Sequence, residues 1–184
     1  MEIADVGVDH TADDNFFAAR VLILGENNHS LEAGWVEGEF WGDTDQHIYS
    51  QDSHTCRRGS CTWADFDSTC DNSRHDAQIA IAAVSSTRWR SSCWDGNSWN
   101  VMHNNINLGD DDSERMEVFG EIYRTVSGGM SLTSSGINFR AIEVRDGSDW
   151  EDWTTSVNTT AWGDDAPYDY EPVRNYTEFN VKNE

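Results

Sequence analysis

Carboxylates are concentrated in the stretch LGDDDSERMEVFGEIYR, residues 108–124, an acidic loop followed by a strand-like segment. A hard cation such as Ca²⁺ binds roughly six to eight oxygen atoms, and Asp110, Asp112 and Glu114 could supply several of them. Their order lacks the D-x-D-x-D-G-x₅-E spacing of a specific calcium loop. A chain with 21 aspartates forms acidic clusters without a binding task. We therefore expect a hydrated loop, with a calcium site at Asp110, Asp112 and Glu114 as the alternative.

The four cysteines lie close together in the sequence, at Cys56, Cys61, Cys70 and Cys93. Four cysteines allow three disulfide pairings. The short, turn-like CRRGSC segment favours Cys56–Cys61, which leaves Cys70–Cys93 as the second bridge. A zinc site formed by Cys56, Cys61, Cys70 and His75 is the competing hypothesis, although its spacing is wider than that of a typical zinc knuckle; free thiols are the third. Disulfides would place the mature protein in an oxidising environment.

Nine tryptophans are many for a chain of 184 residues, and they cannot all fit one small core. Residues 85–100 hold three of them together with arginine and amide side chains. Exposed aromatic side chains often mark recognition surfaces. We expect Trp89, Arg90, Trp94 and Trp99 either to form a saccharide-binding platform or to cap one end of the fold.

Sequence motifs for catalysis are absent: there is no G-x-S-x-G, H-E-x-x-H, G-x-G-x-x-G or P-loop pattern. The stretch HIYSQDSH places His47 and His54 near Asp52, which suits a polar loop as well as a base with its orienting partner. The sequence therefore predicts a protein that is not an enzyme. A small hydrolase that uses Asp or Glu with His is the weaker reading.

Charge is the dominant compositional feature, with 34 acidic against 12 basic residues and a net charge of −22. The bases are 11 Arg and one Lys, Lys182. This Asp-rich, Lys-poor usage resembles that of proteins from organisms that balance external brine with internal salt. At about 1 M salt the Debye length is only roughly 3 Å, so the repulsion is screened. An acidic extracellular protein is the alternative, and both interpretations disfavour nucleic-acid binding because no basic stripe exists.

Strand patterns recur along the chain, whereas no helical apolar pattern persists beyond about two turns. The run at 77–86 also admits an Ala-rich helix. Spacing by Gly, Asn, Asp and Ser predicts a mainly β fold, an antiparallel, jelly-roll-like β-sandwich. The expected strands lie in residues 16–25, 34–42, 77–86, 99–108, 115–124, 129–133 and 136–147.

The C-terminal segment differs from the rest of the chain, since it holds both prolines and many aromatic residues. We expect residues 1–147 to form the sandwich domain and residues 148–184 an aromatic arm that packs on it or on a neighbouring subunit. No run of 18 apolar residues is present, so no membrane span is expected.

These observations favour a structural protein of an extracellular particle in a high-salt environment, most concretely a virion component such as a capsid decoration, turret or tail protein. The expected partners are subunits of the same assembly, in a homo-oligomer, and a cell-surface glycan. We expect synthesis in the cytoplasm without a signal peptide and location on a particle or cell surface. No cofactor is expected apart from the calcium alternative. A secreted carbohydrate-binding module or lectin is the alternative function.

Overall fold

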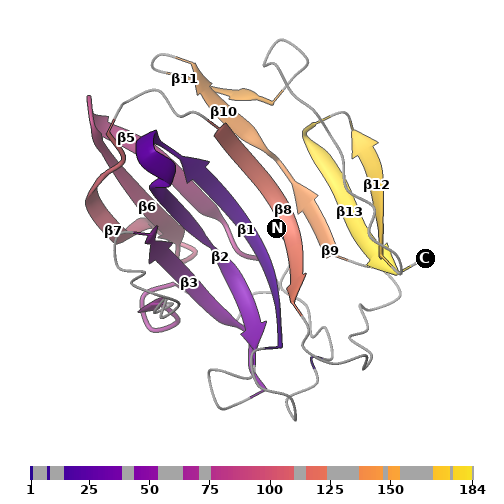
Figure 1. The fold of residues 1–184 in the computed structure, drawn as a ribbon. Helices are drawn as coiled ribbons and strands as arrows, with labels where there is room; N and C mark the ends of the chain where they lie inside the picture. Colours follow the sequence, from indigo (N-terminus) through magenta and orange to yellow (C-terminus); the bar gives the residue numbers. More distant parts are fainter. Residues whose placement is uncertain are drawn as a thin grey trace.

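The computed structural model describes residues 1, 8, 15–38, 44–53, 64–70, 76–109, 115–123, 137–146, 149–153, 168–174 and 176–183. Within these residues the fold is almost entirely β (Figure 1). A single 3₁₀ turn, η1 (Glu26–Asn28), joins the first two strands. The strands are β1 (Phe16–Leu24), β2 (Ser30–Gly38), β3 (His47–Asp52), β4 (Ala64–Asp65), β5 (Ile79–Ser85), β6 (Arg88–Trp94), β7 (Trp99–Asn107), β8 (Arg115–Tyr123), β9 (Ile137–Arg140), β10 (Glu143–Asp146), β11 (Asp149–Asp152), β12 (Tyr168–Arg174) and β13 (Glu178–Asn183).

The first layer is a five-stranded antiparallel sheet in the order β4-β3-β2-β1-β8. β1 is central and pairs along its whole length with β2 on one side and β8 on the other. Its apolar, β-branched sequence FFAARVLIL suits a strand that is covered on both faces. Successive residues point to opposite faces, so Phe17, Ala19 and Ile23 lie on the inner face, whereas Ala18 and Arg20 lie on the outer face.

The second layer covers the inner face of this sheet. The three-stranded sheet β5-β6-β7 packs against β1, β2 and β3. A second three-stranded sheet, β12-β13-β9, also reaches it, because Val181 of β13 lies beside Phe17 at Gly120 of β8. The two layers form a β-sandwich, which confirms the predicted fold class.

One continuous hydrophobic core fills the space between the layers. Trp35 is fully buried and packs against Phe17, with ring centroids 5.5 Å apart. A separate small cluster, Ala18, Val36 and Tyr49, lies on the outer face. The outer face is therefore partly covered, and Arg20 and Glu32 on this face are only 8% and 7% exposed. The other members of the inner core include Leu31, Ile48, Ile81, Trp89, Met102, Ile137, Phe139 and Phe179.

The C-terminal segment contributes strands to the sandwich. β13 pairs with β9, and β11 pairs with β10. Phe179 stacks on Phe139 at 4.6 Å and contacts Tyr170, so aromatic residues of the predicted arm pack on the sandwich core. The boundary at residue 147 and contact with a neighbouring subunit stay predictions.

Several predicted strands coincide with observed ones, and others differ. The run at 77–86 forms a strand, β5, and not the competing helix. The HIYSQDSH stretch, interpreted as a polar loop, forms β3 up to Asp52, and residues 88–94 of the supposed loop-rich platform form β6. The strand expected at 129–133 lies outside the described residues. No helix among the described residues has the length and apolar character needed to cross a bilayer.

Candidate functional site

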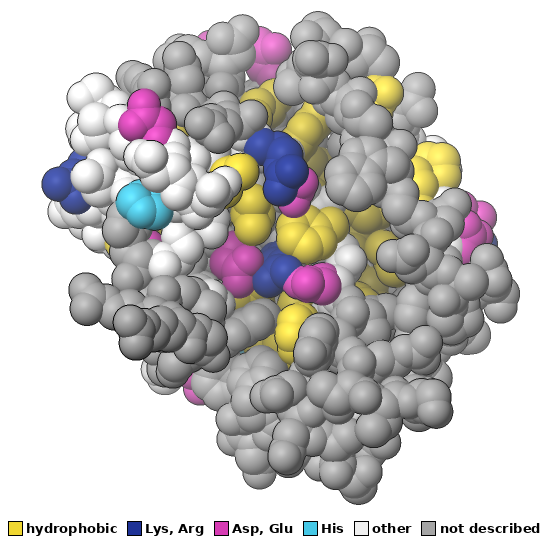
Figure 2. Space-filling model, in the orientation of Figure 1, with side chains coloured by type: hydrophobic (Ala, Val, Ile, Leu, Met, Phe, Trp, Pro, Cys, Tyr) yellow, Lys and Arg dark blue, Asp and Glu magenta, His cyan; other side chains and the backbone are white. Residues whose placement is uncertain are grey.

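A cluster of polar side chains lies on the outer face of the five-stranded sheet. We call Arg20, Glu32, Tyr49, Gln51 and Glu121 the outer-face cluster. The view in Figure 2 shows basic side chains set between carboxylates and hydrophobic side chains near the middle of this side, over β1 and β8. Charged groups in such surroundings are the kind of arrangement that active sites use.

Strand register explains why these residues meet. Arg20 of β1 lies opposite Gly34 of β2 and Phe119 of β8. In the next row, Glu32 lies between Leu22 on β1 and Gln51 on β3. Directly opposed residues on one face have Cβ atoms about 5 Å apart. Glu32 and Gln51 are therefore neighbours on the same face.

Arg20 organises the cluster through its guanidinium group. Its Nη1 donates to both carboxylate oxygens of Glu32, at 3.0 and 2.9 Å. Its Nη2 pairs with Glu121, and the guanidinium carbon lies 4.7 Å from the ring centroid of Phe119. Tyr49 is fully buried in the same group, beside Arg20 and Glu32. Arg20 is thus held by two carboxylates and one aromatic face.

Burial changes the acidity of this cluster. Burial raises the pKa of Glu32 above 4.5, and the opposing effect of Arg20 and the hydrogen bond from Tyr49 do not cancel it. Burial, together with the neighbouring Glu32 charge, raises the pKa of Tyr49 well above 10.0. A carboxyl group that keeps its proton to higher pH is suited to general acid or base chemistry, although buried ion pairs show the same effect.

The backbones of β1 and β2 approach each other closely at Gly34, which lies opposite Arg20. A Cβ atom added at Gly34 would lie 2.7 Å from the Arg20 Cα and would also collide with the Ala19 carbonyl oxygen. Only glycine allows β1 and β2 to approach this closely here. The Gly34 position therefore sets the distance between the strands that carry Arg20 and Glu32.

Glu143 is an accessible carboxylate at the start of β10. Ala141, two residues earlier, has φ of +50°, a conformation that non-glycine residues adopt at a cost. Ile142, between them, is 9% exposed and belongs to the core. Alternation then directs Glu143 away from the core. Among the described residues, none forms a hydrogen bond or an ion pair with its carboxylate.

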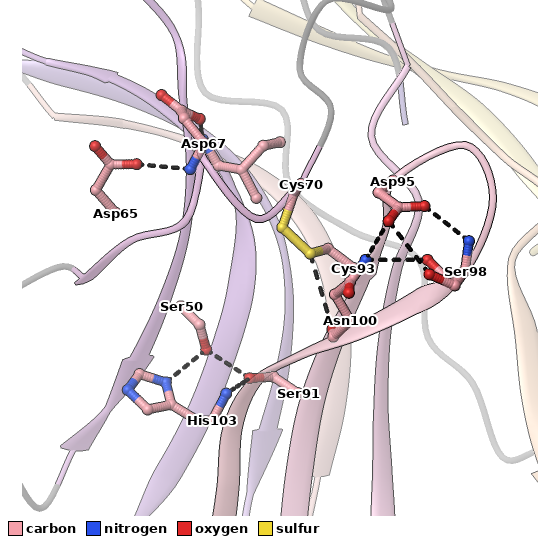
Figure 3. The surroundings of a disulfide bond; sticks show 11 residues. Ser50, Asp65, Asp67, Cys70, Ser91, Cys93, Asp95, Ser98, Asn100 and His103 are labelled. Carbon is pink, nitrogen blue, oxygen red and sulfur yellow. Dashed lines mark hydrogen bonds between the residues drawn. A yellow bond between two sulfur atoms is a disulfide. The ribbon is translucent and has the colours of Figure 1, made fainter.

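A buried polar network crosses the core on the inner face. The Ser50 hydroxyl donates to the Glu32 carbonyl oxygen at 2.8 Å, and it lies 3.0 Å from His103 Nδ1 (Figure 3). Burial lowers the pKa of His103, while the Asp52 charge opposes this. Ser50 is fully buried, so a substrate cannot reach it. The composition resembles a nucleophile with its base, but the burial indicates a structural network.

The predicted Cys70–Cys93 disulfide is confirmed (Figure 3). It joins the turn after β4 to β6, with the two Cα atoms 5.9 Å apart. Because Cys70 is oxidised, the competing zinc site with Cys56, Cys61 and His75 is not formed. Cys56 and Cys61 themselves lie outside the described residues, and so does His75.

The residues of the predicted saccharide platform separate into two groups. Trp89 is only 7% exposed and belongs to the core, so it cannot offer its face to a sugar. Trp94 and Trp99 form an edge-to-face pair at the β6–β7 hairpin, with centroids 5.7 Å apart, and Trp99 is 50% exposed. Arg90 on β6 is half-buried.

The acidic loop with Asp110, Asp112 and Glu114 lies outside the described residues, so its calcium-site alternative stays a prediction. Arg20, Glu32, Gln51 and Glu143 were not among the residues predicted from the sequence. An arginine inside the apolar run of β1 was the available signal, since a buried arginine must find carboxylate partners.

Comparison with known proteins shows the same architecture in a solved structure. The crystal structure of aspergilloglutamic peptidase from Aspergillus niger superposes with a TM-score of 0.61 at 13% sequence identity. The match covers 92% of this chain and 99% of that chain. No family model matches the chain, and neither does any curated protein. The likeness therefore establishes a shared β-sandwich.

The expectation that the protein is not an enzyme requires correction. That expectation depended on the absence of catalytic motifs. The fold, over 92% of the chain, is similar to that of a peptidase. Missing motifs are weak evidence here, because function depends on a site carried by the fold, and strands far apart in sequence can form such a site without any short pattern.

Proposed function

We propose that this protein is a peptidase in which a glutamate carboxyl group activates a water molecule for attack on the peptide bond. The observation that carries the proposal is the likeness, over almost the full length of both chains, to the crystal structure of aspergilloglutamic peptidase. The outer-face cluster and Glu143 supply chemistry of the required kind. The virion and particle-assembly hypotheses stay predictions from the sequence.

Peptide hydrolysis makes three demands on a site. A base must take a proton from the attacking water, a donor must stabilise the oxyanion, and an acid must protonate the leaving amine. A single carboxyl group can serve as base and then as acid. A neutral amide can donate to the oxyanion without changing its protonation state.

Glu143 is the glutamate best suited to the base role. Its carboxylate is exposed, so water and a peptide can reach it. Glu32 and Glu121 are already bound to Arg20. We therefore assign these two glutamates a supporting role, in which they hold Arg20 in place.

Gln51 is the proposed oxyanion donor. It lies on the outer face directly opposite Glu32, on the strand next to the Arg20–Glu32 pair. It is half-buried, which restricts its side chain while leaving one side accessible. Glu32 is its direct cross-strand neighbour on the same face.

The test is hydrolysis of an unfolded protein substrate and of fluorogenic peptides, from pH 2 to 8, in dilute and in molar salt. We expect the wild type to cleave, E143Q to lose at least about 10³-fold in kcat/KM, and Q51A to lose about 10²–10³-fold. E151Q is the matched control, because Glu151 is an exposed glutamate on the adjacent strand β11. It should retain full activity.

Two outcomes would count against the proposal in different ways. A wild-type protein with no cleavage under any of these conditions would overturn the peptidase assignment. Cleavage that survives in E143Q but disappears in E32Q would keep the peptidase and transfer the base role to Glu32. Circular dichroism spectra of each variant establish that the sandwich is intact.

Saccharide binding is a second candidate function, favoured by the exposed Trp94–Trp99 pair. Aromatic faces at a hairpin tip offer a stacking surface for a sugar ring. A glycan screen with W99A tests it. If W99A binds the same glycans as the wild type, the Trp94–Trp99 pair is not the saccharide-binding surface.

A further inference from the structure

His47, Asp65 and Asp67 form a separate cluster at the edge of the five-stranded sheet, which we call the edge cluster. His47 is the first residue of β3, Asp65 is the last residue of β4, and Asp67 lies in the turn that follows. β4 is the edge strand and pairs with β3 through only two residues. The few backbone hydrogen bonds between β4 and β3 therefore need side-chain interactions to help to hold β4 in place.

The three side chains converge through single atoms. His47 Nδ1 lies 2.8 Å from Asp67 Oδ2 and 3.5 Å from Asp65 Oδ2. One ligand atom from each residue lies within 4.8 Å of the others. The imidazole is almost buried, with its side chain 11% exposed, whereas Asp65 is accessible from solvent at 43%. An ion can therefore enter from the Asp65 side.

Backbone hydrogen bonds orient both carboxylates towards this point. Asp65 Oδ1 accepts from the Asp67 N–H at 2.8 Å (Figure 3), and Asp67 Oδ1 accepts from the Ile48 N–H at 2.7 Å. The second oxygen of each carboxylate remains directed at His47. Outer contacts of this kind are what fix the ligands of metal sites.

The charges of the edge cluster are unbalanced without a cation. Two carboxylates face one imidazole, and Nδ1 carries at most one proton, so this nitrogen cannot donate to both carboxylates. A divalent ion would satisfy all three donor atoms together.

We propose that His47, Asp65 and Asp67 bind one divalent transition-metal ion, with Zn²⁺ as the best fit. Imidazole nitrogen with carboxylate oxygen is a donor set that Zn²⁺ accepts, at about 2.0–2.2 Å from each ligand. Tetrahedral ligands at that distance are about 3.4 Å apart, close to the observed 2.8 and 3.5 Å. Calcium fits less well, because it requires more oxygen ligands than the edge cluster offers.

The ion would fasten β4 and its turn onto β3. The turn is closed by hydrogen bonds from the Thr69 and Cys70 N–H groups to the Phe66 carbonyl oxygen, and Cys70 then forms the disulfide to β6. The segment from Asp65 to Cys70 would be anchored at one end by metal and at the other by sulfur. Its role is structural and independent of the proposed peptidase.

The experiment measures zinc binding to the full-length oxidised protein after treatment with EDTA and its removal. Isothermal titration with ZnCl₂ in a non-coordinating buffer should show one site per chain that H47Q and D67N lose. Wild-type Tm should rise with Zn²⁺, whereas the Tm of these variants should not. H29Q and D76N are the matched controls and should bind as the wild type does, since His29 and Asp76 are not part of the edge cluster.

H47Q and D67N could lose zinc binding because they fail to fold. D65N provides a test without this problem, because Asp65 is the most exposed of the three ligands. It should fold normally and bind Zn²⁺ at least about 10-fold more weakly, consistent with loss of one ligand. Absence of binding to the wild type would overturn the proposal and leave an ion pair. Equal binding by the wild type, D67N and D65N would also overturn it, because the ion would then be bound by other acidic groups.

Discussion

The Ser50 hydroxyl oxygen lies 2.8 Å from the Ser91 hydroxyl oxygen, so a buried hydrogen bond joins β3 of the first layer to β6 of the second. Ser91 Oγ also accepts from the His103 N–H at 3.1 Å. Both serines are fully buried. The two layers are therefore joined by a polar contact that lies inside the core.

Replacing Ser91 with alanine should destabilise the protein. The variant S91A leaves the Ser50 hydroxyl and the His103 N–H without this partner, and an unsatisfied buried group costs about 1–3 kcal/mol. Urea unfolding of S91A and of S85A measures the difference, because Ser85 is an exposed serine on β5. A free energy of unfolding for S91A equal to that of S85A would show that the network contributes no stability.

The stability of the fold should depend on pH through Glu32. Its native pKa is raised by burial, so the native state binds this proton more tightly than the unfolded state. This contribution to stability is complete below pH 4.5 and is lost as the pH rises through the raised native pKa. E32Q cannot titrate and should lack this decrease. Urea unfolding between pH 4 and 7 measures both proteins, and parallel curves would contradict the prediction.

Glycine at position 34 should be essential for the packing of β1 on β2. In G34A the new methyl group would meet the backbone at Ala19 and Arg20, which cannot move without separating the strands. We expect a loss of about 3 kcal/mol or more and a disturbed Arg20–Glu32 pair. G120A is the control, because its nearest contact is the tip of the Phe17 side chain at 3.2 Å and not the backbone. A loss in G34A no larger than in G120A would be inconsistent with this account.

Removing the Cys70–Cys93 bridge should lower stability without changing the fold. The bridge closes a loop with a sequence separation of 23, and in the chain-entropy model such a loop contributes about 3 kcal/mol. The double variant C70A/C93A tests this by urea unfolding under oxidising conditions. If the free energy of unfolding of C70A/C93A equals that of the wild type, the unfolded chain is already compact around this segment without the disulfide, and the predicted entropic contribution is wrong.

Salt should stabilise the protein. With a net charge of −22, repulsion within the native state is strong in dilute buffer and is screened above about 1 M salt. We expect Tm to rise continuously from 0.05 to 2 M KCl. A parallel series with EDTA separates screening from ion binding. A Tm that is independent of KCl would contradict the high-salt hypothesis.

The sequence by itself determined the strand-rich character of the chain. The alternation in RMEVFGEIYR and the apolar run FFAARVLIL predicted β8 and β1 because these patterns record which face is buried. The clustering of four cysteines also pointed to Cys70–Cys93. In contrast, β3 and β6 carry serine, glutamine and arginine, and their polar sequences were assigned to loops. They form strands that pair with their neighbours along their length, and their buried serines, Ser50 and Ser91, hydrogen-bond to each other across the core.

Only the tertiary structure decided which polar residues meet. Arg20 and Glu32 are 12 residues apart, and Glu121 belongs to a strand that enters the sheet on the other side of β1. His47 meets Asp65 and Asp67 because β4 returns along the edge of β3. Local sequence patterns record the burial of each strand, but not the order in which strands pair. That order, fixed by packing of the two layers, creates the outer-face cluster and the edge cluster.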